Sequence, residues 1–311
     1  MAFSPSRLDE TELATSFAGV VGRTRTMGAL AFGANRRWKL AIVGRVLNWG
    51  LCDDGRMGTP SLFDQLLDEG NAEPIEGWDF SWFRGRATEA RPSWRYFEGL
   101  SERMVWASAS LDVQTGGGER FAEVLHHVSN RPKTLAATES WRPNADIARS
   151  WLAPLGVTVH EVPDTAPFPF EDETFDLVCS RHPTVTQWSE IARVLQIEGI
   201  YFSQQIGAGT NSELTDFMMD PQPNSESRRL DQAVSLAASV GLEVIDAQEE
   251  SLAVEFFDVG AVIYFLRKVV WTVPDFSTDK YRERLKLMHD HIEANGSFLS
   301  HSQRFLIEAR K

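Results

Sequence analysis

The rhythm of hydrophobic and polar positions changes at about residue 93. Beyond it, short runs rich in β-branched and aromatic residues alternate with longer stretches of helical periodicity. Strands that alternate with helices of this length are typical of βαβ units and a parallel sheet. The predicted strands are 110–113, 134–138, 157–162, 175–180, 200–204, 242–250 and 303–309, and the predicted helices between them are 119–128, 144–155, 185–195 and 225–240.

This pattern predicts an α/β fold, with a Rossmann-like seven-stranded mostly parallel sheet and helices on both faces. Residues 86–311 would form this domain. Two helical segments, 258–270 and 278–295, follow the sixth strand and make a helical insertion at about 253–298. We expect the last strand to return antiparallel beside the sixth.

Residues 1–85 have a different pattern and are expected to be a largely helical N-terminal segment. Helices are predicted over 36–51 and 61–68, and the linker 70–78 is expected to be irregular because it holds Pro74 and Gly77. An aromatic segment, 77–86, ends this region. Its aromatic side chains are expected to pack the N-terminal segment onto the body or to cover a binding pocket.

Composition narrows the class of protein. The chain has 311 residues, 42% of them apolar, and no apolar run approaches the roughly 20 residues that a membrane span needs. Two cysteines are too few for a disulfide framework, and no secretory signal is evident, so we expect a cytoplasmic protein that is not bound to a membrane. The net charge of −13 argues against nucleic-acid binding by the whole surface.

One stretch departs from this acidic balance. Residues 14–52 contain several Lys and Arg residues and, before Asp53, no acidic ones. Such a stretch is either a solvated basic face that balances an acidic body or a site for an anionic substrate or partner.

A glycine-rich turn follows the first predicted strand of the sheet. The strand ends in Leu111-Asp112-Val113 and continues through Gln114-Thr115-Gly116-Gly117-Gly118 into a helix. Glycines at such a turn let a ligand approach the backbone at a helix N-terminus. The next strand closes with Glu139, about twenty residues on, where a nucleotide-binding Rossmann unit has its acceptor for ribose hydroxyls.

Three further stretches occur in order after this turn. Pro163-Asp164-Thr165-Ala166-Pro167-Phe168-Pro169-Phe170 leads into Glu171-Asp172-Glu173-Thr174-Phe175-Asp176-Leu177-Val178, and Glu190-Ile191-Ala192-Arg193-Val194-Leu195 precedes the fifth strand. With the glycine turn, these motifs resemble those of the class I S-adenosylmethionine-dependent methyltransferases, and the resemblance covers about 111–204. Gln114 stands where that family has its first glycine, and Ile197-Glu198 replaces its Pro-Gly.

The resemblance implies S-adenosylmethionine as cofactor and a role for each matching position. Glu139 would hold the ribose and Asp164 the adenine amino group. Separately from the resemblance, Arg84 or Arg86 would meet the methionine carboxylate if the aromatic segment covers the pocket. The candidate cofactor-binding residues are Asp112, Thr115, Gly116, Gly118, Glu139, Asp164, Thr165, Arg84 and Arg86.

The methyl acceptor is expected beyond the fourth strand of the sheet, where Arg181 and His182 lie. His182 is the candidate general base, because a neutral imidazole can take a proton near neutral pH. It could instead only shape the pocket. Arg181, Gln204 and Gln205 are candidate substrate-binding residues. No metal site is expected, since His289 and His291 lie two apart on a predicted helix and face different directions.

The predicted function is therefore transfer of a methyl group to a small-molecule substrate that no motif identifies. An RNA-base methyltransferase is an alternative, favoured by the basic stretch and by a loose likeness of 265–276 to ribosomal guanine methyltransferases. A non-catalytic S-adenosylmethionine-binding protein of the same fold is another, suggested by Gln114. A nicotinamide-dependent oxidoreductase is less favoured, because no second glycine fingerprint occurs. No feature indicates an oligomeric state.

Overall fold

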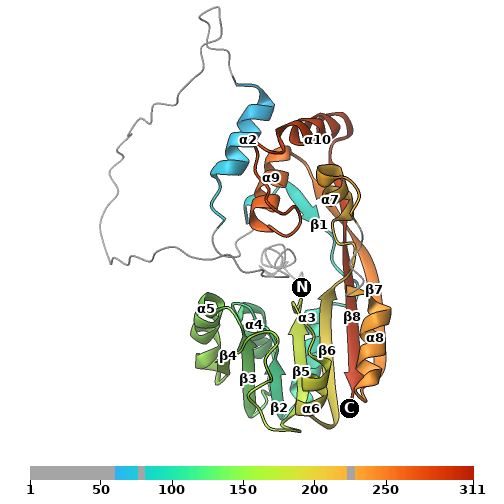
Figure 1. The fold of residues 1–311 in the computed structure, drawn as a ribbon. Coiled ribbons are helices and arrows are strands. Elements are labelled where there is room, and N and C mark those ends of the chain that lie inside the picture. The colour runs from blue at the N-terminus through green and yellow to red at the C-terminus, as the bar shows by residue number, and fades with distance from the viewer. Residues whose placement is uncertain (1–59, 76–80, 223–227) are drawn as a thin grey trace, which may run out of the picture.

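An eight-stranded sheet in the order β1-β7-β8-β6-β5-β2-β3-β4 forms the centre of the protein (Figure 1). The structure is a computed structural model, and it describes residues 60–75, 81–222 and 228–311. The strands are β1 (Ala87–Glu89), β2 (Ala109–Asp112), β3 (Thr134–Glu139), β4 (Thr158–Glu161), β5 (Phe175–Arg181), β6 (Leu195–Ile206), β7 (Glu243–Phe256) and β8 (Phe298–Arg310).

The strand directions confirm the predicted Rossmann-like sheet. Strands β4, β3, β2, β5 and β6 are mutually parallel, whereas β8 runs antiparallel between β6 and β7. The return of the last strand beside the sixth predicted strand is thereby confirmed. The eighth strand, β1, pairs antiparallel with the far end of β7 and was not predicted.

Helices cover both faces of the sheet, as predicted. One face packs against α3 (Tyr96–Trp106), α4 (Glu119–His127) and α5 (Arg142–Leu152), and the other against α6 (Trp188–Val194) and α8 (Leu230–Ser239). Neighbouring strand residues alternate between these two cores. Leu177 packs with α3 and α4, for example, and Val178 packs with α6.

A third core lies where β7 and β8 extend beyond the parallel strands. It is built from α2 (Leu62–Ala72), α7 (Ser212–Met219), α9 (Val259–Lys268) and α10 (Arg282–Asn295), of which α2, α9 and α10 gather at the top of Figure 1. Helices α9 and α10 occupy the predicted helical insertion. Phe63 and Leu67 of α2 pack there with α9, so the described part of the N-terminal segment contributes to this core.

Two glycines explain why α2 runs past the predicted start of the linker. A Cβ on Gly70 would lie 2.6 Å from the Gly260 carbonyl oxygen, and one on Gly260 would lie 2.8 Å from the Leu66 carbonyl oxygen. Only glycine permits so close an approach of the α2 and α9 backbones. Gly70 is therefore a helix-packing residue, and the linker begins after Ala72 instead.

Some predictions fall outside the described residues: the helix over 36–51, the basic stretch 14–52, and Trp78 and Phe80 of the aromatic segment. Of that segment, Phe83 is buried against Tyr264 and Phe265, and Trp82 meets Tyr264 edge-on. In the described ranges, no helix combines the length and the apolar character that crossing a membrane requires.

Candidate active site

The turn between β2 and α4, residues 114–118, is called the glycine turn here. Gly116 and Gly118 both have positive φ, +63° and +81°. Their surroundings differ. A Cβ on Gly118 would lie 2.9 Å from Leu152 Cδ1, whereas a Cβ on Gly116 would have nothing within 4 Å. Gly118 is thus needed for packing on α5, and Gly116 opens onto space that a ligand can approach.

Glu139, the last residue of β3, joins the neighbouring strand to this turn. Its Oε2 accepts a hydrogen bond from the Gly116 N–H (2.9 Å), and its Oε1 accepts one from the Trp141 N–H (2.9 Å). Burial raises the pKa of Glu139, and the two backbone donors oppose that shift. Gly116 of the turn and Glu139 at the end of the next strand, both predicted from the sequence, are therefore in direct contact.

Asp112 lies buried at the base of the turn. Its Oδ1 lies 3.5 Å from Cys179 Sγ on the adjacent strand β5, close enough to accept the thiol proton. Burial raises the pKa of Asp112 to about 6. A carboxyl whose folded-state pKa exceeds its unfolded value favours folding when it is protonated.

This shift predicts a pH dependence of stability. The contribution of Asp112 should be most favourable below pH 3.8 and should be lost as the pH rises to about 6, by a total of about 3 kcal/mol. Asp112→Asn removes this titration. Urea unfolding at pH 4 and pH 8 should therefore show the variant gaining stability relative to the wild type at the higher pH. Groups that do not interact with Asp112 are common to both proteins and cancel, and the pKa values of its partners Cys179 and Tyr96 are raised above their ordinary values. Parallel pH profiles would therefore contradict the raised pKa of Asp112.

Gln114 links the glycine turn to the loop after β5. It has a φ of +58°, in the region that glycine favours, and its Nε2 donates to the Val185 carbonyl oxygen (2.7 Å). Its Oε1 accepts from the Thr184 N–H (2.6 Å) and lies 2.8 Å from Thr184 Oγ1, whose hydroxyl has one proton to donate. Thr184 Oγ1 also lies 2.8 Å from Asp164 Oδ2. Gln114, Thr184 and Asp164 thus connect loops that follow β2, β5 and β4.

Thr184 was not among the predicted site residues. The sequence indicated Thr184 only indirectly. Gln114 stands in place of a glycine, and its side-chain amide needs hydrogen-bond partners nearby, of which Thr184 is one. Thr165, which was predicted beside Asp164, is exposed.

The ends of β5 and β6 bring two predicted acceptor residues together. The His182 N–H donates to the Gln204 carbonyl oxygen (2.7 Å), and the side-chain atoms His182 Nε2 and Gln204 Nε2 are 2.9 Å apart. Gln205 points to the opposite face, where its Oε1 accepts from Thr186 Oγ1 (3.2 Å). Arg181 is half-buried and pairs with Gln204 in the parallel ladder. His182 and Gln204 therefore share one side of the sheet, without Gln205.

Arg86, predicted to meet the methionine carboxylate, contacts carboxylates of the protein. Its Nε lies 3.1 Å from Asp258 Oδ2 at the start of α9, its NH2 pairs with Glu69 of α2, and its guanidinium lies 4.0 Å from the centre of the Trp82 ring. Arg84 is exposed. Arg86 therefore ties α2 and the aromatic segment to α9.

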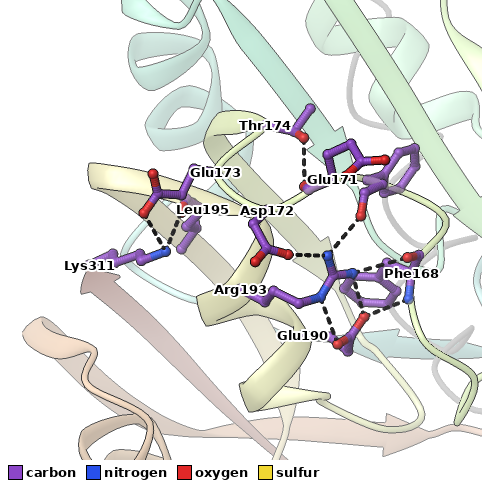
Figure 2. Close-up of polar contacts among 10 residues, drawn as sticks. Phe168, Glu171, Asp172, Glu173, Thr174, Glu190, Arg193, Leu195 and Lys311 are labelled. Atoms are coloured by element: carbon purple, nitrogen blue, oxygen red, sulfur yellow. Dashed lines mark hydrogen bonds and ion pairs between the residues drawn. The ribbon is translucent and has the colours of Figure 1, made fainter.

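The other motif residues form a hydrogen-bonded cluster around Arg193 (Figure 2). Arg193 of α6 donates to both carboxylate oxygens of Glu190 (2.8 and 2.9 Å), to Asp172 Oδ1 (2.8 Å) and to the Phe168 carbonyl oxygen (3.0 Å). Hydrogen bonds with Arg193 lower the pKa of Glu190. These contacts hold the loop before β5 onto α6.

A buried ion pair joins β8 to β1. Arg304 NH2 of β8 lies 2.9 Å from Glu89 Oε1 of β1, and the two side chains are only 3% and 1% exposed. After burial and the charge of Arg181, the positive charge of Arg304 also lowers the pKa of His182. Within the described part of the chain, no group of three or more His, Cys, Asp or Glu side chains has an arrangement that could hold a metal ion.

Comparison with known proteins supports the fold and goes no further. No protein-family model matches the chain, and no curated protein matches it. A functionally unknown protein from Deinococcus radiodurans R1 aligns at a TM-score of 0.50 and 13% identity, over 72% of this chain and 90% of its own. A protein from Bacillus halodurans C-125 proposed to be a methyltransferase aligns at a TM-score of 0.49 and 17% identity, over 69% and 98%.

A third solved structure is phosphoethanolamine N-methyltransferase 2 from Haemonchus contortus, in complex with phosphomonomethylethanolamine and S-adenosylhomocysteine. It aligns at a TM-score of 0.42 and 17% identity, over 70% of this chain and 52% of its own. The match to the Deinococcus radiodurans protein agrees with the strand order and directions in showing a Rossmann-like α/β fold.

Proposed function

We propose that this protein is an S-adenosylmethionine-dependent methyltransferase that binds its cofactor against the glycine turn and Glu139. The observation that carries the proposal is the hydrogen bond from the Gly116 N–H to the Glu139 carboxylate (2.9 Å). It joins a turn whose backbone a ligand can reach to an acid that can accept hydrogen bonds from ribose hydroxyls.

The residues present fit such a cofactor. The Glu139 carboxylate accepts backbone hydrogen bonds from Gly116, Trp141 and Ser140, and a carboxylate has about four acceptor positions in all, so acceptor capacity remains. Asp164 Oδ2 is engaged by Thr184, and its second oxygen can accept from an amino group. The open space at Gly116 gives the ligand room next to the backbone.

S-adenosylmethionine, when bound, supplies a methyl group that its sulfonium already activates. The protein then has to position the acceptor and to exclude competing acceptors. Gln114 and Thr184 would keep the loop after β5 aligned with the glycine turn. His182 and Gln204, at the ends of β5 and β6, would meet the acceptor.

The proposed acceptor is a small molecule, in keeping with the net charge of −13. Two assays separate this proposal from its alternatives. Retention on RNA that weakens steeply with salt would favour a nucleic-acid acceptor instead. Binding of S-adenosylmethionine with no methyl transfer to any acceptor in a broad screen would favour a non-catalytic protein.

Glu139→Ala should weaken binding of S-adenosylmethionine by about 1–3 kcal/mol, measured by calorimetry. The substitution removes the proposed acceptor for ribose hydroxyls and also frees the Gly116 N–H from its partner. Both effects lower affinity.

Glu161→Ala is the matched control. Glu161 ends β4, the next strand, but is exposed and pairs only loosely with Arg149 (3.9 Å). Its replacement should leave the affinity for S-adenosylmethionine unchanged. If the two variants bind equally well, the ribose assignment to Glu139 is wrong.

A further inference from the structure

The orientation of the Gln204 side chain follows from its contact with Trp94. The indole Nε1 of Trp94 lies 2.8 Å from Gln204 Oε1. An indole nitrogen can only donate a hydrogen bond, so the atom facing it must be the amide oxygen. The amide NH2 of Gln204 consequently faces His182.

That orientation determines the tautomer of His182. Gln204 Nε2 lies 2.9 Å from His182 Nε2, and because the amide nitrogen only donates, His182 Nε2 must accept. In a neutral imidazole one nitrogen accepts and the other carries the proton. The proton of His182 is therefore on Nδ1.

Backbone geometry keeps the two side chains together. The His182 N–H donates to the Gln204 carbonyl oxygen at 2.7 Å, and His182 has a φ of +57°. Both side chains are buried, with 7% and 5% of their residues' surface exposed. Trp94 reaches Gln204 from the segment before α3, so three separate parts of the chain define this arrangement.

The charges around His182 favour its neutral form. Arg181 lies next to it in the chain, and Arg304 approaches from β8 with Glu89 of β1 as its ion-pair partner. From α3, Tyr96 Oη donates to the Ser180 carbonyl oxygen (3.1 Å) and adds no charge. Burial, then the two arginines, lower the pKa of His182 well below its usual value.

We propose that Trp94 and Gln204 are positioning residues that hold His182 as the Nδ1–H tautomer, so that His182 offers the acceptor an N–H donor in place of a base. The role toward an acceptor rests on the proposed methyl transfer, whereas the tautomer does not. In this arrangement, protonating Nε2 would break the hydrogen bond from Gln204.

The tautomer can be measured directly on the full chain without any ligand. Protein labelled with ¹⁵N-histidine gives long-range ¹H–¹⁵N correlations that distinguish protonated from unprotonated ring nitrogens, and His182→Asn assigns the His182 signals by their loss. Near neutral pH we expect a protonated Nδ1 and an unprotonated Nε2. A protonated Nε2 in the wild-type protein, either as the other tautomer or as imidazolium, is sufficient to overturn the proposal.

Trp94→Phe tests the positioning role. It keeps an aromatic ring but removes the indole N–H, so the Gln204 amide can rotate and the His182 signals should shift toward a mixture of tautomers. Trp106→Phe is the same substitution at a site that is 86% exposed, and it should leave the spectrum of His182 unchanged. If both variants retain the wild-type signature, Trp94 does not position His182.

This experiment fails or succeeds independently of the proposed function. Loss of S-adenosylmethionine binding in Glu139→Ala tests the cofactor site, whereas the ring signals of His182 test the Trp94–Gln204–His182 arrangement. An unexpected tautomer together with normal cofactor binding would overturn this inference and leave the proposed function in place.

Discussion

Arg304→Met should destabilise the protein by about 3–5 kcal/mol, measured by urea unfolding. Arg304 and Glu89 form an ion pair whose side chains are 3% and 1% exposed. Removal of the arginine leaves the Glu89 carboxylate buried without its counter-charge, and such a charge is far more costly than the pair itself. The pair also joins the edge strand β1 to β8 across the intervening strand β7.

Two further variants make this expectation specific. Arg310→Met removes another arginine from β8, but its pairs with Glu243 and Glu198 are exposed and screened by solvent, so we expect a far smaller loss than for Arg304→Met. The double variant Glu89→Leu/Arg304→Met removes both buried charges and should recover most of the stability lost by Arg304→Met. Equal losses for the two single arginine variants would show that the buried pair has no special role.

The parallel part of the sheet could be predicted because its signals are local. In β5, every residue from Leu177 to Ser180 is buried, and the run of apolar and small residues makes this visible in the sequence. Strand β1 has no such signal, since it has three residues and forms only by pairing with Phe256 and its neighbours on β7. Gly70 was misread for a similar reason, because the helix that requires it lies far along the chain.

The candidate site likewise has one part with local sequence signals and one part without them. The spacing between Gly116 and Glu139 is a property of one βαβ unit, so their contact could be expected from the sequence. The contact between Trp94 and Gln204 joins residues 110 positions apart, and that between Glu89 and Arg304 joins residues 215 apart. No periodicity or motif encodes such pairs, and only the fold brings them together.

His182 illustrates the consequence for chemistry. Its position after β5 predicts a residue near the acceptor, and the residue type alone suggests a base. The hydrogen bond that Gln204 donates to Nε2 engages the lone pair that a base would use. The chemical role of a histidine thus depends on partners that are distant in the sequence.

Gly116→Asn should weaken S-adenosylmethionine binding by at least about a hundred-fold, or about 2.7 kcal/mol, with little effect on folding. Asparagine tolerates the positive φ of Gly116 (+63°) better than other side chains, which limits backbone strain. A Cβ there would meet no protein atom within 4 Å, so the new side chain projects into the space that we assign to the cofactor.

Two glycines supply the comparison. Gly156, before β4, has a φ of +84° and equally open surroundings, so Gly156→Asn should cost similar stability and leave S-adenosylmethionine binding intact. Gly118→Asn should instead destabilise the fold by about 1–3 kcal/mol, since its Cβ would meet Leu152 at 2.9 Å. Calorimetry and thermal unfolding of the three variants separate ligand contact from packing. If Gly116→Asn binds S-adenosylmethionine as tightly as Gly156→Asn does, the cofactor does not lie against the glycine turn, and the proposed site must be abandoned.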